Sequence, residues 1–508
     1  MLMPDNHDTS ILVRGVNWVG DAVMTIPAIR ALRKACPGAH ISLLVKPSVR
    51  PVFEAEPAVD EIIDYDDRFR GIRGKISLAA FLRKRKFSRA ILLQNAFDAA
   101  LLAFLAGIPE RTGYNRDGRG LLLTRPVACD GADRKVHHIQ YYLNLLAAAG
   151  IRAEYTHPRI HLLPEEREKA RESLSRLRRP VLGINPGAAF GSAKRWLPGR
   201  FAGVASLFIR DTGGSVVIFG GGGETDIAKE IVAGRESADM LDLAGKTSLR
   251  ELIGLISECD VFLTNDSGPM HIAYAVGTPL AALFGSTDPL LTGPVGEGNA
   301  IIRKAFDCGP CFKRTCARKD LRCMYAITAD EVYESIRKIL PQRKAVFFDR
   351  DGTLCKDADY LNAWENFELF PDIGEVLKLK AAGFSLFGVS NQSGICRGIV
   401  DEPFVKQVND TFLDKYGFDD FYYCPHCPED HCCCRKPEPG MLLSARAKHG
   451  IDLRASYVVG DKDDDMLLAK AVGAKGILVK TGKKMGSIHA CHTSDNLKDV
   501  VEYIITHG

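Results

Sequence analysis

Two aspartates lie two residues apart at the end of a short apolar run. In AVFFDRDGT, Asp349 and Asp351 follow a run that begins at Ala345 and that we expect to be a buried strand. Two carboxylates buried at this spacing are costly unless a cation or a proton compensates their charge. A divalent cation is the natural solution, whereas the simpler alternative is that both side chains only cap a turn.

Two later apolar runs end in further polar residues. FSLFGVS leads into residues 390–392 (SNQ), and SYVVG leads into the acidic run 461–465 (DKDDD). Because the carboxyl ends of parallel strands meet at one edge of a sheet, we expect these residues to converge on Asp349. Lys436 can add positive charge at the same place.

The loop from Cys424 to Cys434 holds five cysteines and two histidines within eleven residues. Cysteine and histidine pairs at such short spacings can close a tetrahedral zinc site. A zinc ion there would fix the backbone that directs Lys436 toward the carboxylates. The alternative is a cluster of reduced cysteines that holds no metal.

The elements that must position these residues are short β-branched runs that alternate with helical segments. Such runs occupy residues 11–16, 41–46, 89–94, 181–185, 215–220, 261–265 and 279–285. This alternation predicts parallel sheets with crossover helices. A chain of 508 residues with 46% hydrophobic content is too long for one core, and we expect α/β domains at residues 1–170, 171–341 and 342–508.

Composition excludes several classes of protein. Lys and Arg exceed Asp and Glu by only four, so bulk charge gives no sign of nucleic-acid binding. The amino terminus has no apolar signal, and the most apolar segment, residues 99–108, is about half the length that a bilayer requires. We therefore expect no transmembrane segment, and we expect the fifteen cysteines to stay reduced in the cytoplasm.

The amino-terminal part carries signals suited to a sugar nucleotide. Residues 15–21 (GVNWVGD) follow the first expected strand, and residues 264–271 (TNDSGPMH) run from a strand into a helix start. Backbone amides at that helix start, together with the charge of Lys194, suit a diphosphate. Taken alone, Asp21 is better explained as a helix N-cap and His271 as a packed core histidine.

The motifs DRDGT, SNQSG, CRKP and VGDK, in this order, resemble the haloacid dehalogenase superfamily of phosphatases. The resemblance implies a Rossmannoid domain in which Asp349 forms an aspartyl-phosphate and Asp351 is the general acid and base. It implies Mg²⁺ held by Asp349, the Asp351 backbone carbonyl and Asp461. Ser390 and Lys436 would bind the phosphoryl group.

Within that superfamily, a zinc loop ending in CRKP resembles the heptose 1,7-bisphosphate phosphatases, over nearly all of residues 344–485. The implied zinc ligands are Cys424, His426, Cys432 and Cys434. The implied substrate contacts are Asp357, Tyr360, Ser390, Asn391, Gln392, Ser393, Arg435, Lys436 and Lys462. The spacer between the ligand pairs has only five residues, so Cys427, His431 and Cys433 stay open as replacement ligands.

The segments VNWVGDAVMTIPAIRAL, INPGAAFGSAKRW and TNDSGPMHIAYAVGTPLAALFGSTDP resemble the lipopolysaccharide heptosyltransferases of glycosyltransferase family 9, above all those of type II, over about residues 11–340. The resemblance implies a GT-B pair of Rossmann-like domains, ADP-heptose as donor, inversion at the anomeric carbon and no metal. Asp21 would be the general base. The implied donor-binding residues are Lys194, Glu224, Asp266, Ser267, Gly268 and His271.

Two further groups leave alternatives open. The basic run at residues 83–86 (RKRK) could contact an anionic acceptor or a membrane surface, or could be a solvated helix face. A second cysteine group begins as C-x-x-C, but its later spacing is irregular, so a second zinc site stays open. Its members are Cys308, Cys311, Cys316 and Cys323.

Both resemblances point to one sugar, and we expect a cytoplasmic bifunctional enzyme of lipopolysaccharide inner-core assembly. Its expected partners are heptose 1,7-bisphosphate, ADP-heptose and an anionic glycolipid acceptor at the inner membrane, where a peripheral position stays open. Mg²⁺ and a structural Zn²⁺ are the expected cofactors of the phosphatase. The alternatives are histidinol phosphate as the phosphatase substrate, or one half that binds a nucleotide sugar or scaffolds without catalysis.

Overall fold

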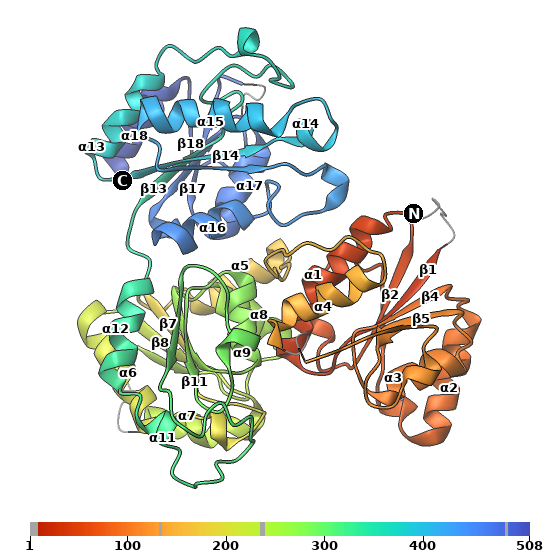
Figure 1. Cartoon of the computed structure of the whole chain (residues 1–508). Coiled ribbons are helices and arrows are strands. Elements are labelled where there is room, and N and C mark those ends of the chain that lie inside the picture. Colours follow the sequence, from red (N-terminus) through yellow and green to blue (C-terminus); the bar gives the residue numbers. More distant parts are fainter. Residues whose placement is uncertain (1–8, 132–134, 234–238, 483–485) are drawn as a thin grey trace. The chain divides into compact units, whose positions relative to one another are not determined.

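Three parallel sheets organise the chain. The computed structural model describes residues 9–131, 135–233, 239–482 and 486–508, and the chain divides into two units, Met1–Ile339 and Leu340–Gly508 (Figure 1). The first unit holds two six-stranded sheets and the second unit holds one. All paired strands are parallel, which confirms the predicted α/β class with crossover helices.

The first sheet has the strand order β3-β2-β1-β4-β5-β6. Its strands are β1 (Ser10–Arg14), β2 (His40–Val45), β3 (Glu61–Asp64), β4 (Arg89–Leu92), β5 (Glu110–Tyr114) and β6 (Arg125–Val127). Helices α1 (Val19–Ala35) and α4 (His138–Ala148) cover one face, and α2 (Gly71–Lys84) and α3 (Phe97–Leu105) cover the other. Successive side chains of β1 point to opposite faces of the sheet, so Ile11 and Val13 belong to the core under one helix layer and Leu12 belongs to the core under the other.

The second sheet has the order β12-β11-β10-β7-β8-β9. Its strands are β7 (Val181–Asn185), β8 (Ser215–Ile218), β9 (Met240–Asp242), β10 (Val261–Asn265), β11 (Leu280–Phe284) and β12 (Asn299–Arg303). Its helices are α5 (Pro164–Leu174), α6 (Pro198–Thr212), α7 (Thr225–Val232), α8 (Leu249–Ser257), α9 (Gly268–Val276), α10 (Pro289–Thr292), α11 (Arg322–Tyr325) and α12 (Ala329–Ile339). Buried side chains of α1, α4, α8 and α9 share one apolar core, so packed helices join both sheets of the first unit.

The sheet of the second unit has the order β15-β14-β13-β16-β17-β18. Its strands are β13 (Ala345–Phe348), β14 (Ser385–Asn391), β15 (Asp420–Cys424), β16 (Tyr457–Gly460), β17 (Lys475–Val479) and β18 (His492–Ser494). Helices α13 (Leu377–Ala381), α15 (Glu402–Tyr416) and α18 (Leu497–His507) pack on one face, and α16 (Gly440–His449) and α17 (Asp463–Val472) pack on the other. The central strand β13 therefore ends between β14 and β16, as the sequence motifs require.

The expectation that all cysteines stay reduced is wrong for one pair. Cys396, at the end of the short helix α14 (Ser393–Cys396), forms a disulfide with Cys427 of the cysteine loop. The fold brings these two turns together, with the Cα atoms 5.7 Å apart, although 31 positions separate them in sequence. The other thirteen cysteines are free thiols. None of the helices in the described ranges combines the length and the apolar character that crossing a membrane requires.

Candidate active sites

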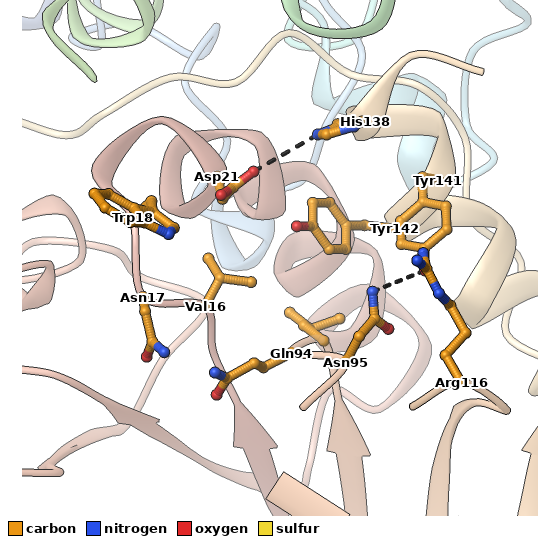
Figure 2. A pocket seen from close by; sticks show the side chains of 11 residues that line it. Val16, Asn17, Trp18, Asp21, Gln94, Asn95, Arg116, His138, Tyr141 and Tyr142 are labelled. Atoms are coloured by element: carbon orange, nitrogen blue, oxygen red, sulfur yellow. Dashed lines mark hydrogen bonds and ion pairs between the residues drawn. The ribbon is translucent and has the colours of Figure 1, made fainter. Parts of the chain in front are cut away.

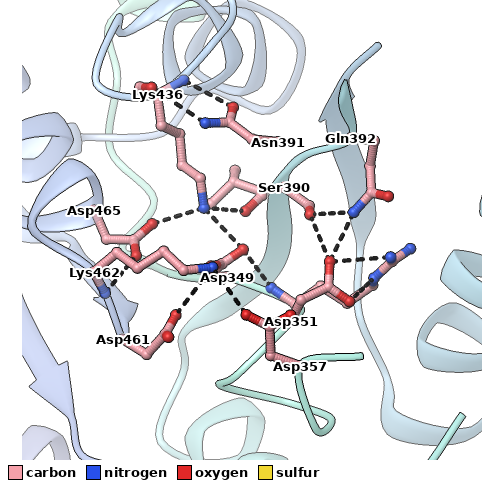
Figure 3. Close-up of polar contacts among 12 residues, drawn as sticks. Asp349, Asp351, Asp357, Ser390, Asn391, Gln392, Lys436, Asp461, Lys462 and Asp465 are labelled. Carbon is pink, nitrogen blue, oxygen red and sulfur yellow. Dashed lines mark hydrogen bonds and ion pairs between the residues drawn. The ribbon is translucent and has the colours of Figure 1, made fainter. Parts of the chain in front are cut away.

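The carboxyl ends of β13 and β16 bring together three buried carboxylates, as Figure 3 shows. Oxygens of Asp349, Asp461 and Asp465 all lie within 4.8 Å of one another. The ammonium of Lys436 is also buried, with Nζ 2.8 Å from Asp349 Oδ1 and 2.7 Å from Asp465 Oδ1. Three buried carboxylates exceed the charge of this one buried ammonium, so the cluster fits a divalent cation bound by oxygen ligands.

Burial and charge act in opposite directions on this cluster. Burial raises the pKa of Asp349 to about 6, although the ammonium of Lys436 opposes that rise. Burial alone would lower the pKa of Lys436, but the charges of Asp349 and Asp465 outweigh it and raise that pKa above its ordinary value. Lys436 is therefore a permanent cation placed against the carboxylate that the sequence predicted as nucleophile.

The carboxylate of Asp351 has different partners. It accepts hydrogen bonds from Arg350 Nε and Nη2 at 3.1 and 3.0 Å, and from Gln392 Nε2 at 2.8 Å. Gln392 also donates to Ser390 Oγ at 2.7 Å. The chain turns sharply after Asp351, and this turn depends on Gly352, which has a φ of +91° and on which a Cβ would lie 2.7 Å from Asp461 Cγ. The turn leaves the Asp351 carboxylate outside the cluster of three.

The remaining predicted substrate contacts surround this cluster. Lys462 Nζ lies 3.4 Å from Asp357 Oδ2. The side-chain amide of Asn391 does not face open space, because it forms hydrogen bonds with the backbone of Lys436. Tyr360 packs against Gly394 near the start of α14, which begins at Ser393. Asp465 belongs to the acidic run after β16 that the sequence predicted to converge on Asp349, although the sequence assigned it no role of its own.

Four residues of the cysteine loop form a compact ligand cluster. The sulfurs of Cys424, Cys432 and Cys434 lie 3.4 to 3.5 Å apart, and His426 Nδ1 lies 3.3 Å from Cys434 Sγ. In a tetrahedral zinc site with Zn–S bonds of about 2.3 Å, the sulfur atoms are separated from one another by distances similar to those found here. This donor set therefore fits zinc. The described residues contain only two clusters of metal-ligand type, this one and the Asp349 cluster.

The replacement ligands left open by the sequence do not belong to this cluster. Cys427 is bonded to Cys396, while His431 is exposed and Cys433 is only half-buried. The second cysteine group, residues 308–323, lines one small cavity in the first unit. Its sulfurs are not gathered as the metal-ligand clusters are.

The predicted donor-binding residues of the first unit lie at the carboxyl ends of β7, β8 and β10. Lys194 forms an ion pair with the buried carboxylate of Asp266, which also accepts a hydrogen bond of 2.5 Å from Thr287 Oγ1. Ser267 immediately precedes α9, and Gly268 is its first residue. Glu224 accepts a hydrogen bond from the Gly221 amide and lies directly over Gly187, where no side chain would fit.

Asp21 lines a polar pocket of about 390 Å³ (Figure 2). It is the third residue of α1, and Trp18 occupies the N-cap position, so the capping explanation of Asp21 is wrong. His138 Nδ1, from the first residue of α4, lies 3.6 Å from Asp21 Oδ1. The other polar lining includes Asn95 and Arg116, which follow β4 and β5.

His271 joins the two halves of the first unit. Its ring is buried, and a Cβ placed on Gly20 of α1 would lie 2.6 Å from its Cδ2. Burial lowers the pKa of His271 to about 4, so the ring is neutral at pH 7. The surroundings of His271 are therefore those of a packed core histidine, which is the simpler of the two explanations that the sequence offered.

In comparisons with known proteins, the two units match two different families. The model of glycosyltransferase family 9 (heptosyltransferase) matches residues 76–322, and a haloacid dehalogenase hydrolase-like model matches residues 433–504. Lipopolysaccharide heptosyltransferase 2 of Escherichia coli (strain K12) is 34% identical over 349 residues, which is 66% of this chain and 99% of that protein. The chain belongs to glycosyltransferase family 9. The solved structure of E. coli ADP-heptose lipopolysaccharide heptosyltransferase II superposes with a TM-score of 0.58 at 30% identity, over 65% of this chain and 98% of that one.

The family 9 enzyme carries a second family at its carboxyl end. D-glycero-beta-D-manno-heptose-1,7-bisphosphate 7-phosphatase of Haemophilus ducreyi is 41% identical over 179 residues, which is 32% of this chain and 98% of that protein. The second unit is therefore a haloacid dehalogenase-type phosphatase of this family.

Sequence reasoning missed most of the pocket around Asp21 in this glycosyltransferase. Asn95, Arg116, His138, Tyr141 and Tyr142 all line it. For Arg116 a signal existed, since ERTGY precedes it and polar residues after a strand line ligand sites. The α4 residues gave no such signal, because only the packing of α4 on α1 brings them to Asp21.

Proposed function

We propose that this chain is a bifunctional enzyme of lipopolysaccharide inner-core assembly. Its first unit transfers heptose from ADP-heptose to a lipid A-linked core, and its second unit hydrolyses the C7 phosphate of heptose 1,7-bisphosphate. One observation carries the proposal: each unit matches nearly the full length of a relative, and the two relatives are enzymes of the same sugar. We place the reactions in the cytoplasm, with the acceptor at the inner face of the inner membrane.

In the phosphatase, the Asp349 carboxylate attacks phosphorus and displaces the sugar oxygen, which takes a proton from Asp351. Asp351 then accepts a proton from water as the water attacks the aspartyl-phosphate and releases inorganic phosphate. The hydrogen bonds from Arg350 and Gln392 orient Asp351 for both steps. Lys436 offsets charge on the phosphoryl oxygens from its position against Asp349.

Two metal sites support this chemistry. Mg²⁺ held by Asp349, the Asp351 carbonyl and Asp461 would supply positive charge to the transferring phosphoryl group. Asp465 shares the cluster and holds Lys436 in place. In the cysteine loop, Cys424, His426, Cys432 and Cys434 would bind a structural zinc that fixes the backbone leading to Arg435 and Lys436.

In the transferase, Asp21 removes the proton of the acceptor hydroxyl as that oxygen attacks the anomeric carbon from the face opposite ADP, with inversion. The donor diphosphate lies against the amides at the start of α9, near Ser267 and Gly268. Lys194 offsets the charge that develops on the leaving diphosphate, and donor binding exchanges its ion pair with Asp266 for a phosphate contact. Glu224, Asp266 and His271 complete the donor side.

The test uses the purified intact chain. Phosphate release is measured on both anomers of heptose 1,7-bisphosphate and on histidinol phosphate, and transfer from ADP-heptose to a lipid A-linked core acceptor is followed by mass spectrometry. We expect turnover of the heptose bisphosphate and addition of one heptose. Preference for histidinol phosphate would select the rival phosphatase, and absence of transfer by a chain that binds ADP-heptose would make the first unit a binding module.

A further inference from the structure

The pocket around Asp21 carries opposite charges on its lining. Asp21 and His138 lie together, while Arg116 extends from the segment after β5 beside Tyr141, as Figure 2 shows. The ion pair seen in this pocket joins Asp21 and His138, and among the described residues Arg116 forms none, although the charge of Asp117 acts on it. Its guanidinium is instead associated with the Tyr141 hydroxyl, which raises the pKa of Arg116. A cation held against a neutral hydroxyl at a pocket wall can accept an anionic partner.

Two buried arginines behind the lining add to this positive charge. Arg14 donates to the carbonyls of Gly15 and Leu44 at 2.5 and 3.1 Å, and Arg119 donates to the Tyr114 carbonyl at 2.8 Å. Burial lowers the pKa of each to about 10, so both stay charged at pH 7.

The carboxylates that act on these arginines are Asp98 for Arg14 and Asp117 for Arg119, and neither of them lines the pocket. Arg14 also lies 5.2 Å from the centre of the Tyr65 ring. Asp98, whose charge acts on Arg14, is itself paired with Lys75.

These arginines also orient the amides that line the pocket. Arg14 Nη2 donates to Asn17 Oδ1 at 3.3 Å, and Arg119 Nη2 donates to Asn95 Oδ1 at 3.2 Å. Because both amide oxygens are occupied by an arginine, the amide nitrogens are left to face other partners, and Asn95 Nδ2 donates to the Tyr141 hydroxyl at 3.0 Å. This side of the pocket therefore presents donors and positive charge.

We propose that Arg116 binds an anionic group, a carboxylate or a phosphate, on the acceptor sugar and thereby sets which hydroxyl reaches Asp21. The inference rests on the proposed transferase activity and adds a specificity residue to it. Asp21 repels an anion, so an anionic acceptor binds with that group toward Arg116 and with a hydroxyl toward the base.

The basic run at residues 83–86 is less suited to this task. It lies on the exposed end of α2, where Arg85 pairs with Glu61 and Arg83 donates to the Leu105 carbonyl at 2.5 Å. Two of its four side chains therefore already have partners in the protein. The described residues that line the Asp21 pocket include none of these four.

The experiment compares the intact chain with Arg116→Gln, with the conservative Arg116→Lys and with the exposed control Arg152→Gln. Steady-state transfer is measured on the native core acceptor, on the acceptor with its phosphates removed, and on the acceptor with its carboxylates reduced to alcohols. Thermal unfolding of each variant is recorded, and kcat, the KM for the acceptor and the KM for ADP-heptose are determined separately.

Loss of a charge-assisted contact is expected to raise the acceptor KM about 10- to 100-fold in Arg116→Gln, with kcat and the donor KM within about twofold. Arg116→Lys should recover part of the loss, and the penalty should vanish on whichever modified acceptor lacks the recognised anion. An unchanged acceptor KM, or a penalty that persists on both modified acceptors, overturns the inference while leaving the transferase intact. No transfer by the unsubstituted chain would instead overturn the proposed function, and this inference with it.

Discussion

The side-chain amide of Asn391 forms two hydrogen bonds with the backbone of Lys436. Asn391 Oδ1 accepts from the Lys436 amide at 2.9 Å, and Asn391 Nδ2 donates to the Lys436 carbonyl at 3.2 Å. Asn391 ends β14, whereas Lys436 lies at the end of the cysteine loop, so this pair fixes the loop to the sheet. Through it, Lys436 Nζ is held against Asp349.

Asn391→Ala should therefore impair the phosphatase by releasing this loop. Losing two partly buried hydrogen bonds costs roughly 1–3 kcal/mol of stability in the second unit, and a displaced Lys436 should lower kcat about 10-fold. Phosphate release and thermal unfolding measure the two effects, with the exposed Asn366→Ala as control. A kcat equal to that of the unsubstituted chain would mean that the pair does not position Lys436.

The cysteine loop offers a matched pair of neighbours for a metal test. Cys432 belongs to the ligand cluster and Cys433 does not. Cys432→Ser should therefore lower the zinc content below about one per chain and reduce the unfolding temperature of the second unit, whereas Cys433→Ser should change neither. Metal analysis of freshly reduced protein decides the matter. Equal zinc in both variants would remove Cys432 from the site.

The buried ring of His271 predicts how the first unit responds to acid. Its pKa of about 4 lies below the ordinary value of about 6.5, so the unfolded chain binds the proton more readily than the folded chain. The stability of the neutral ring is fully present above pH 6.5 and is lost as the pH falls toward 4, by roughly 3 kcal/mol in total. Urea unfolding across this range should show a shallower pH dependence for His271→Gln than for the exposed control His40→Gln. Equal slopes in the two variants would contradict the assignment.

Strands with their own β-branched runs could be predicted from the sequence, and strands at the sheet edges could not. The segments of β1, β7, β10 and β13 are mainly apolar, because each strand lies inside a sheet and is buried on both faces. The short strands β6 (RPV) and β18 (HTS) lie at edges and form because a neighbouring strand offers its hydrogen bonds.

The same distinction applies to the candidate sites. The residues around Asp349 follow strands that meet at one sheet edge, so their order in sequence predicted their convergence. Arg116 follows β5, so its position in the pocket could have been predicted in the same way, whereas His138 reaches Asp21 only through the packing of α4 on α1. The bond between Cys396 and Cys427 likewise depends on how two turns meet, which local sequence does not encode.

The division of the chain predicts that each half folds alone. Each unit has its own sheets and its own buried core. Fragments 1–341 and 342–508, expressed separately, should each keep activity close to that of the intact chain. A fragment that is folded but inactive until mixed with the other would show instead that the contact between the halves has a function.

The central claim is that one chain holds two independent active sites, and a crossed pair of variants tests it most directly. Asp21→Ala and Asp349→Asn are made separately in the intact chain, and each is assayed for heptosyl transfer and for phosphate release from heptose 1,7-bisphosphate. We predict that Asp21→Ala loses transfer at nearly unchanged ADP-heptose affinity and retains phosphate release, and that Asp349→Asn shows the reverse pattern of activities. Loss of both activities in either variant, or full retention of the activity assigned to the substituted residue, would contradict the account.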